Sequence, residues 1–233
     1  MHSCFLNIHG VCVKVAAQQP DTIKEIAEVY NLFLSPYQPG QQAEVVIEDD
    51  GEIFTILARN GMFAFHAAAY ENDNHRGIML PGRSASGKTT IAFSALLSGH
   101  PLVGDDVVLA HFDGRDFNLL PFKNYLNLKQ NGQCEKYNIL EHHPKEILCQ
   151  TYARAIVFPQ IMPGESTGIS RIDNYRTIYS NLLSTSVWVK DNLLRMKQAE
   201  MLQELARLPA YNMFLGPDHK ERQQLAIEML DRI

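Results

Sequence analysis

One short segment, residues 82–89, restricts the fold of this chain more than any other. It reads Gly-Arg-Ser-Ala-Ser-Gly-Lys-Thr and fits the pattern G-x-x-x-x-G-K-[ST]. Glycines are needed there because backbone amides must close around phosphate oxygens without a Cβ in the way, and a helix must follow so that its positive end faces the anion. The segment therefore predicts an α/β unit, with a strand before the loop and a helix after it.

The flanking sequence has the character that such a loop requires. The apolar "GIML" at 77–80 is typical of a short buried strand, and residues 88–98 are apolar on most faces, as in a buried helix. Lys88 would neutralise the β and γ phosphates, and the Thr89 hydroxyl would ligate Mg²⁺. The other expected nucleotide contacts are Gly82, Arg83, Ser84, Ala85, Ser86, Gly87 and Thr90. The loop specifies phosphate and not the base, so the expected cofactors are Mg²⁺ and ATP or another nucleoside triphosphate.

Two adjacent aspartates, Asp105 and Asp106, follow the next short apolar strand. A helix over 88–98 moves about 16 Å away from the loop at 1.5 Å per residue. Gly99 reverses the chain, and a strand over 101–105 returns by about 16 Å at 3.3 Å per residue, so both carboxylates should reach the loop. One could then hold Mg²⁺ while the other orients an incoming hydroxyl, a division that suits a kinase. In the alternative, one carboxylate acts as a metal ligand and the other only caps a turn.

The N-terminal part of the chain predicts mainly strands. Residues 3–16 alternate apolar and polar positions and predict a hairpin. Residues 23–34 predict a helix capped by Asp21 or Thr22. Residues 43–71 contain Asp-Asp-Gly and Asn-Gly between apolar runs, which is typical of an antiparallel meander of three strands.

After the aspartates, the chain predicts further strands and then helices. Residues 107–112 and 117–122 indicate a second hairpin, and residues 153–159 a later strand. The strands at 77–80 and 101–104, joined by a helix, are expected to pair in parallel. Tail helices are expected at 174–187, 192–207 and 219–232, the last with Asp218 as its N-cap.

Composition limits the classes of function. The chain has 233 residues, of which 45% are hydrophobic, and we expect a single domain with an N-terminal strand and helix region (1–62), a nucleotide-binding core (63–188) and C-terminal helices (189–233). A net charge of -5 without a basic cluster argues against a nucleic-acid partner. No leader and no run of about 18 apolar residues is found, so we expect a soluble, cytoplasmic protein that has no membrane partner.

The loop, followed at this interval by "SGHPLVGDD", resembles the HPr kinase/phosphorylase family and its related serine kinases, whose pattern runs from a phosphate loop through a helix to GH-x-L-V-x-D-D. His66 in "FAFHAAA", on the strand preceding the loop, resembles the histidine that this family keeps just upstream. The resemblance is specific over residues 66–108. It implies an α/β fold with a P-loop kinase-like sheet of the HPr kinase type, an N-terminal antiparallel strand region and C-terminal helices.

The resemblance also implies a role for each site residue. Lys88 and Thr89 bind phosphate and Mg²⁺, Asp105 is the catalytic acid/base, and Asp106 assists with the metal or the acceptor. His66 would lie beside the transferred phosphate as a further catalytic residue. On residue type alone, a histidine in such an apolar segment is more often a hydrogen-bonded core residue.

The chain departs from the bifunctional HPr enzymes at two places. Thr90 stands where they usually have Glu, and residues 119–129 contain no equivalent of their Glu-Arg-Gly segment. Compact members of the group, such as kinases of lasso-peptide precursors, are more similar. The sequence therefore predicts a Mg²⁺-dependent kinase that transfers the γ-phosphate of ATP to a serine hydroxyl of a peptide or small protein, such as a lasso-peptide precursor. The alternatives are a small-molecule hydroxyl as acceptor, or a nucleotide-binding regulator without catalysis.

Two further features concern partners. Arg83, Lys123 and Arg171 are candidate contacts for phosphate or acceptor, although lysine and arginine are by default solvated surface charges. The apolar stripe of the helix at 192–207 is typical of a core or of a dimer face, so a homo-oligomer is one expectation.

Overall fold

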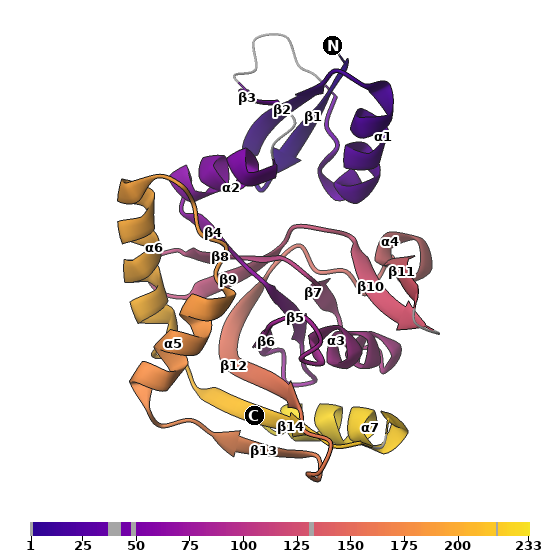
Figure 1. The fold of residues 1–233 in the computed structure, drawn as a ribbon, viewed down its shortest axis with the longest axis vertical. Helices are drawn as coiled ribbons and strands as arrows, with labels where there is room; N and C mark the ends of the chain where they lie inside the picture. The colour runs from indigo at the N-terminus through magenta and orange to yellow at the C-terminus, as the bar shows by residue number, and fades with distance from the viewer. Residues whose placement is uncertain (1, 37–42, 48–49, 131–132, 218) are drawn as a thin grey trace.

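The computed structural model of the chain describes residues 2–36, 43–47, 50–130, 133–217 and 219–233. Figure 1 shows a mixed α/β fold with a large central sheet, a smaller N-terminal sheet at one end and helices on both sides. The strands of the large sheet are β4 (Met62–Phe65), β5 (Ala67–Glu71), β6 (Gly77–Pro81), β7 (Leu102–Gly104), β8 (Val108–Phe112), β9 (Phe117–Pro121), β12 (Thr151–Ile161), β13 (Gly168–Arg171) and β14 (Ala210–Leu215). They run in the order β4-β8-β9-β12-β6-β5-β7, and β14 pairs with both β12 and β13. The predicted α/β class is confirmed.

The strand directions bring several strand ends to one edge of the sheet. β12 pairs in parallel with β6 and β14, and β5 pairs antiparallel with both β6 and β7. β6, β7, β12 and β14 therefore run in the same direction, so their carboxyl ends lie at the same edge. The predicted direct pairing of β6 with β7 is wrong because β5 lies between them, but their common direction, on which the expected site depends, is preserved.

Helices cover both faces of this sheet: α3 (Lys88–Leu97) and α7 (His219–Leu230) on one side, and α5 (Tyr175–Thr185) and α6 (Asn192–Leu205) on the other. Successive side chains of β5 alternate between the two faces, since Ala67 belongs to the cluster with α5 and α6 whereas Ala68 belongs to the cluster with α3 and α7. Burial on both faces explains why β6 is apolar and buried along its whole length. None of the helices in the described part of the chain is both long and apolar enough to span a bilayer.

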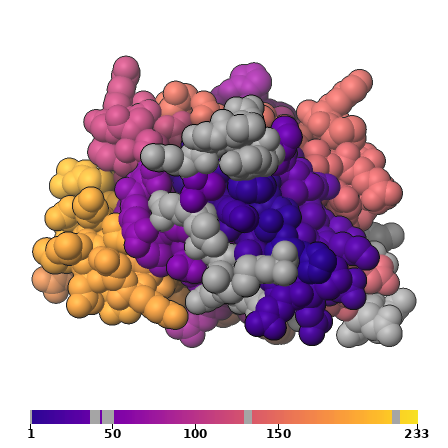
Figure 2. Space-filling view, turned by 90° about the horizontal axis from the view of Figure 1, so that it is seen from above, coloured from indigo at the N-terminus to yellow at the C-terminus, as the bar shows by residue number. Residues whose placement is uncertain are grey.

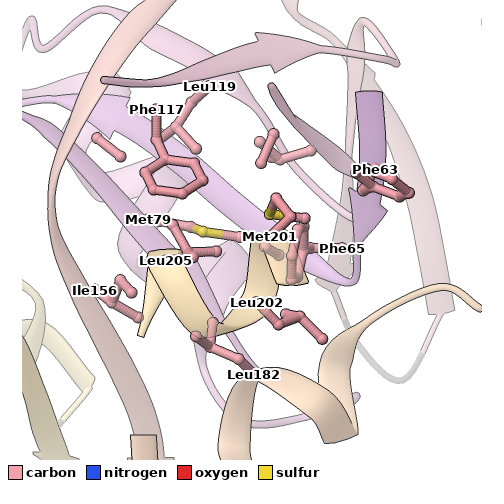
Figure 3. Close-up of a cluster of buried hydrophobic side chains, with 14 of the residues drawn as sticks. Phe63, Phe65, Met79, Phe117, Leu119, Ile156, Leu182, Met201, Leu202 and Leu205 are labelled. Atoms are coloured by element: carbon pink, nitrogen blue, oxygen red, sulfur yellow. The ribbon is translucent and has the colours of Figure 1, made fainter. Parts of the chain in front are cut away.

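Figure 3 shows the hydrophobic cluster on the α5 and α6 face. Leu182 from α5 and Leu202 from α6 lie against the strand residues Phe65, Met79 and Ile156, and all five are fully buried. Each such side chain stabilises the fold by roughly 1.5–3 kcal/mol relative to leaving it in water. The tail helices that the sequence predicts are confirmed, and the apolar stripe of α6 packs largely into this core.

The N-terminal region forms a second sheet that packs against the large one. β1 (His2–Ile8) and β2 (Val11–Ala17) pair as the predicted hairpin, and β3 (Glu44–Ile47) follows α1 (Pro20–Val29). Leu6 and Val15 share a buried cluster with Met62 and Leu109 of the large sheet. Figure 2, seen from above, shows the indigo N-terminal residues in the middle of this face, with the gold-coloured residues of the α6 region to one side.

Two predictions for this region are wrong. Residues 50–59 form a helix, α2 (Asp50–Arg59), and not a strand, and β3 pairs in parallel with β2 and is not part of an antiparallel meander. Ile53, Ile56 and Leu57 recur at helical spacing and are all buried. Asp-Asp-Gly is typical of a turn, but this helical spacing competes with it, and short apolar runs fit either element.

The first helix also begins earlier than predicted. It starts at Pro20, which suits a first helical position because the amide hydrogen that proline lacks has no partner there. Gln19 is the N-cap residue, so the predicted caps Asp21 and Thr22 lie inside the helix. A short 3₁₀ turn, η1 (Asn31–Phe33), follows.

Several elements have no counterpart in the sequence prediction. β10 (Tyr125–Gln130) and β11 (Gln133–Asn138) form an antiparallel hairpin that leads into the short helix α4 (Ile139–His142). β13 and β14 lie before and after the pair α5 and α6 and extend the large sheet. The predicted hairpin of β8 and β9 and the predicted strand within β12 are confirmed. Asp218, the expected N-cap of α7, lies outside the described residues.

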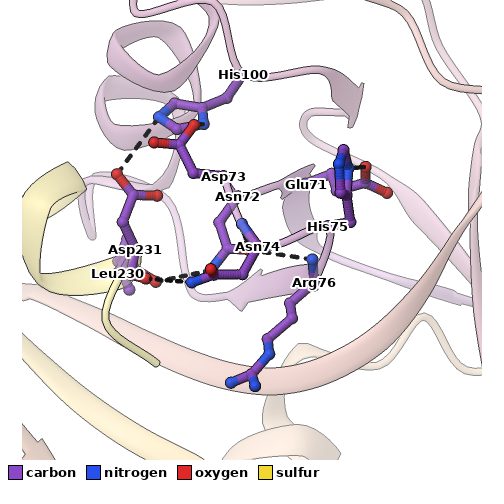
Figure 4. Close-up of polar contacts among 9 residues, drawn as sticks. All are labelled: Glu71, Asn72, Asp73, Asn74, His75, Arg76, His100, Leu230 and Asp231. Carbon is purple, nitrogen blue, oxygen red and sulfur yellow. Dashed lines mark hydrogen bonds and ion pairs between the residues drawn. The ribbon is translucent and has the colours of Figure 1, made fainter.

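The C-terminal end of α7 is fixed to the turn between β5 and β6, as Figure 4 shows. The side-chain amides of Asn72 and Asn74 donate to the backbone oxygens of Leu230 at 3.0 Å and Asp231 at 2.7 Å. Asn72 is buried and also accepts from the backbone amides of Asn74 and Arg76. This turn therefore holds α7 in place beside α3.

A group of ionisable side chains lies next to this turn. The buried imidazole of His100, which follows α3, has Asp73 at 3.4 Å from Nδ1 and Asp231 at 3.7 Å from Nε2. A protonated His100 would therefore pair with a carboxylate on each side of its ring. One ring nitrogen and one oxygen of each carboxylate also lie within 4.8 Å of one another, and such groups can ligate a metal ion.

Candidate phosphate-binding and phosphoryl-transfer site

The loop between β6 and α3 has the backbone that the phosphate-loop pattern requires. Gly87, directly before α3, has a φ of 104°, a left-handed conformation that glycine adopts without a steric cost. A Cβ on Gly87 would overlap the side chain of Leu215 at the end of β14. Gly82 donates its backbone N–H to the carbonyl of His66 at 3.2 Å. α3 begins at Lys88, so the unpaired amides of its first turn lie at the loop.

Gly87→Ala is expected to weaken the binding of Mg·ATP by at least about tenfold, or 1.4 kcal/mol, because the new Cβ displaces the loop from Leu215. Gly114→Ala is the matched control, since Gly114 also has a positive φ, 96°, but no atom of the described residues lies within 4 Å of its Cβ position. In both variants, placing a residue with a Cβ at a positive φ lowers the free energy of unfolding by about 1–2 kcal/mol. Calorimetric titration beside thermal melts separates the two effects, and equal nucleotide affinity in both variants would contradict this assignment.

A pocket of about 580 Å³ lies beside the loop, within the usual size range for small-molecule sites. His66, residues 84–90, Asp105 and Asp106 line it. The further lining residues are Phe93, Asn127, Leu128, Cys134, Ile161 and Gln223. The structure thus brings the predicted loop and the predicted aspartate pair into one cavity, while Gly82 and Arg83 form the start of the loop outside its lining.

Asp105 is fully buried at the end of β7 and contacts the first turn of α3. Its Oδ2 accepts a hydrogen bond from the Thr89 hydroxyl at 2.8 Å. Burial raises the pKa of the Asp105 carboxyl, although Thr89 and the nearby Lys88 act in the opposite direction. Its Oδ1 is buried and has no hydrogen-bond partner in the described part of the chain. A hydroxyl and an unpartnered carboxylate oxygen side by side are ligands that Mg²⁺ accepts, so these residues fit the expected metal.

Asp105→Asn is expected to raise the melting temperature of the protein, measured without nucleotide or Mg²⁺, at pH 7. A carboxyl with a raised pKa binds its proton more tightly in the folded chain, so it lowers stability as the pH rises above the ordinary carboxyl range of about 4. Below that range both states are protonated and the contribution vanishes. The difference in melting temperature should therefore be largest near pH 7 and shrink toward pH 4. A difference that grows on acidification would show that burial does not dominate at Asp105.

Asp106 lies in a different environment from its neighbour. Its Oδ1 is 3.4 Å from His66 Nε2, and its Oδ2 accepts a hydrogen bond from Lys123 Nζ at 2.9 Å. The contacts with His66 and then with Lys123 lower the pKa of the Asp106 carboxyl far below its ordinary range, and they outweigh partial burial. Two adjacent carboxylates with pKa values moved in opposite directions are suited to different roles.

Lys88 and His66 complete the polar lining. Lys88 Nζ lies 3.2 Å from His66 Nε2 and donates to the backbone carbonyl of Arg83 at 3.2 Å. Burial lowers the pKa of Lys88, opposed by the charges of Asp105 and Asp106. Lys88 therefore places a buried cation at the loop, in the position that the pattern predicts for a phosphate ligand.

His66 lies in the bend between β4 and β5, and not on the strand directly before the loop, because β6 intervenes. Its backbone N–H donates to the Thr185 carbonyl at 2.7 Å, and its own carbonyl accepts from Gly82. The backbone of His66 is thus bonded to the start of the loop and to the end of α5. This explains how a histidine in an apolar segment reaches the pocket: the bend turns its side chain away from the core.

The three cations that the sequence offers as phosphate or acceptor contacts lie in different environments. Lys123, which residue type alone assigns to the surface, is only 17% exposed and pairs with Asp106. Arg171 is 68% exposed, pairs with Asp173 and is not among the described lining residues. The Arg83 side chain is exposed, and only its carbonyl contacts the site.

Sequence reasoning also missed most of the lining outside the loop and the aspartates. Phe93 had an available signal, because it follows Thr89 by one helical turn and so lies on the same face of α3. Asn127, Leu128 and Cys134 come from the hairpin of β10 and β11, and Gln223 from α7. Their positions depend on how these elements pack on α3, which no local pattern encodes.

No family model and no curated protein matches the sequence. Among solved structures, the Hpr(Ser) kinase/phosphatase from Coxiella burnetii is similar, with 11% sequence identity and a TM-score of 0.46. The match covers 72% of this chain and 94% of that chain.

Proposed function

We propose that this protein is a Mg²⁺-dependent kinase that transfers the γ-phosphate of a nucleoside triphosphate to a hydroxyl group. The expected nucleotide is ATP. The favoured acceptor is a serine of a peptide or small protein, as the sequence resemblance implies. The proposal takes the residues of the pocket as one site: Lys88 and Thr89 on the loop, Asp105 and Asp106 at the end of β7, and His66.

The observation that carries this proposal is the presence of two carboxylates beside the loop with different partners. Asp105 is buried against the Thr89 hydroxyl, whereas Asp106 is partly exposed and paired with Lys123 and His66. Besides the metal ligand, phosphoryl transfer needs a group that orients the attacking oxygen, which is an acceptor hydroxyl in a kinase and water in a hydrolase. The second, ionised carboxylate supports phosphoryl transfer over simple nucleotide binding.

These contacts favour a division of roles between the aspartates that is the reverse of the one implied by the resemblance. Asp105, bonded to Thr89, is the more suitable Mg²⁺ ligand, since in phosphate-loop enzymes the loop hydroxyl and a nearby aspartate hold the metal. Asp106, ionised and accessible, is the more suitable partner for an acceptor hydroxyl. The raised pKa of Asp105 supports the original assignment, because a base works best with a pKa near the working pH. The variants Asp105→Asn and Asp106→Asn distinguish the two assignments.

The proposed transfer of the γ-phosphoryl group uses a small number of the pocket residues. The acceptor oxygen forms a bond to the γ-phosphorus, the bond to the bridging oxygen breaks, and the nucleoside diphosphate leaves with that electron pair. The hydroxyl proton passes to Asp106, while Lys88 and the loop amides stabilise charge on the phosphoryl group as it moves. Thr89 and Asp105 would hold Mg²⁺, and the ion would supply neutralisation of phosphate charge. His66 lies beside both Lys88 and Asp106 and can hydrogen-bond the moving phosphoryl oxygens.

The test is incubation of the protein with γ-labelled ATP and Mg²⁺, first alone, then with a peptide library and then with a metabolite pool. We expect labelled peptide serine, and no labelled acceptor with Lys88→Ala. Label found only in a metabolite would replace the peptide by a small-molecule acceptor. Bound ATP with no transfer in any arm would contradict a kinase and favour a nucleotide-binding regulator.

A further inference from the structure

Lys123 lies in the segment that joins β9 to β10, and its side chain reaches the site by bonding to Asp106. Phe122 and Asn124, on either side of Lys123, are 0% and 1% exposed. The Phe122 ring packs edge-on against Tyr30 with 5.1 Å between centroids, and the Asn124 carbonyl accepts from the backbone amide of Ile139 at 2.9 Å. The backbone of Lys123 is therefore fixed by buried neighbours on both sides, which is unusual for a lysine in a connecting segment.

The side chain of Lys123 forms an ion pair with the carboxylate of Asp106. Its Nζ donates to Asp106 Oδ2 at 2.9 Å, and it lies 5.7 Å from the centroid of the Tyr125 ring, within cation–π distance. Burial lowers the pKa of Lys123, but the hydrogen bond and charge of Asp106 outweigh burial and raise it. A partly desolvated, hydrogen-bonded pair of this kind is stronger than an ion pair on the open surface.

The backbone of Asp106 shows why such a partner matters. Asp106 has a φ of 65°, a left-handed conformation that is uncommon for residues with a Cβ and that aspartate adopts more readily than most. Such a conformation persists at functional sites where the surroundings determine it. Lys123 on one carboxylate oxygen and His66 on the other fix the direction in which Asp106 faces the pocket.

We propose that Lys123 is a positioning residue for phosphoryl transfer, which fixes Asp106 toward the acceptor hydroxyl through its hydrogen bond. This inference rests on the proposed function and deepens it. Lys123 does not contact the nucleotide in this account; it acts through Asp106 alone. Its removal should therefore change the transfer step and not the binding of ATP.

The kinetic test compares Lys123→Met with Lys123→Arg and with Lys136→Met. Lys136 is the matched control, because it is exposed and lies over the same Tyr125 ring at 5.2 Å. Lys123→Met should lower kcat at least tenfold and leave the KM for ATP within twofold. Lys123→Arg should recover part of kcat, and Lys136→Met should match the wild type. An unchanged kcat in Lys123→Met would overturn the proposal, as would a loss confined to the KM for ATP.

A measurement that needs no turnover separates this proposal from the proposed function. Crystal structures of the wild type and of Lys123→Met are compared for the direction of the Asp106 side chain, with Lys123→Gln as a second variant if the first does not fold. We expect the Asp106 carboxylate to face the pocket in the wild type and to lose that direction in the variant. An Asp106 side chain that is unchanged in the folded variants would overturn the role of Lys123 whether or not the chain is a kinase. Absence of transfer with a displaced Asp106 would reject only the kinase.

Discussion

Asp106→Asn is expected to lower the rate of phosphoryl transfer by about 10²–10⁴-fold, the usual contribution of a positioned acid or base. Binding of Mg·ATP should stay within about twofold of the wild type, a change below 0.5 kcal/mol. The amide of Asn keeps the size of the carboxyl but can neither accept the hydroxyl proton nor form the ion pair with Lys123. Single-turnover rates with labelled ATP, beside calorimetric titration of Mg·ATP, measure the two quantities separately.

Asp105→Asn is the matched comparison, since it makes the same chemical change one residue away. If Asp105 holds Mg²⁺ with Thr89, this variant should need more Mg²⁺ for tight nucleotide binding, whereas Asp106→Asn should not. The opposite pattern, with normal Mg²⁺ dependence and no transfer in Asp105→Asn, would assign the acceptor-side role to Asp105. Undiminished transfer in Asp106→Asn would remove Asp106 from the mechanism.

Lys88→Met is expected to reduce transfer by at least about 10²–10³-fold, the effect of removing one strong stabiliser of developing charge. Affinity for Mg·ATP should fall as well, because the lysine would pair with phosphate in the ground state too. The stability of the fold should not fall. Lys88 is only 4% exposed, and an apolar side chain of similar length avoids burying a charge there. We therefore expect an unchanged or higher melting temperature with lost activity.

Lys24→Met is the control for Lys88→Met. Lys24 is 75% exposed and forms a surface pair with Asp21, and such pairs contribute little. This variant should match the wild type in nucleotide affinity and transfer. Equal losses in both variants would indicate a nonspecific charge effect, and full activity of Lys88→Met would exclude Lys88 from phosphate binding.

The loop and the aspartate pair could be predicted because each depends on local rules. Gly82, Gly87 and Lys88 fix a loop by spacing, and known rises per residue bring a strand of this length back to the loop. The structure agrees, since the Thr89 hydroxyl bonds to Asp105. The prediction survived the wrong strand pairing because it needed only a common direction of β6 and β7, and the insertion of β5 between them preserves that direction.

The rest of the site depends on packing between distant segments. Lys123 is a site residue because Phe122 and Asn124 are anchored in separate parts of the core, and neither anchor is visible in the local pattern. α2 was missed for another reason: its short apolar run fits a strand or a helix, and only burial against the N-terminal sheet decides between them. Thr90, an expected nucleotide contact on the loop, lines the pocket.

The most direct measurement of the central claim is the fate of the γ-phosphate. The wild type and Asp106→Asn are supplied with γ-labelled ATP, Mg²⁺ and peptide acceptors, and label is counted in acceptor and in inorganic phosphate. We predict that the wild type places label on a peptide serine, that inorganic phosphate stays a minor product, and that Asp106→Asn loses the acceptor label. Release of inorganic phosphate by the wild type at the same rate with and without acceptor, and no labelled acceptor, would contradict a kinase and indicate a nucleotide hydrolase.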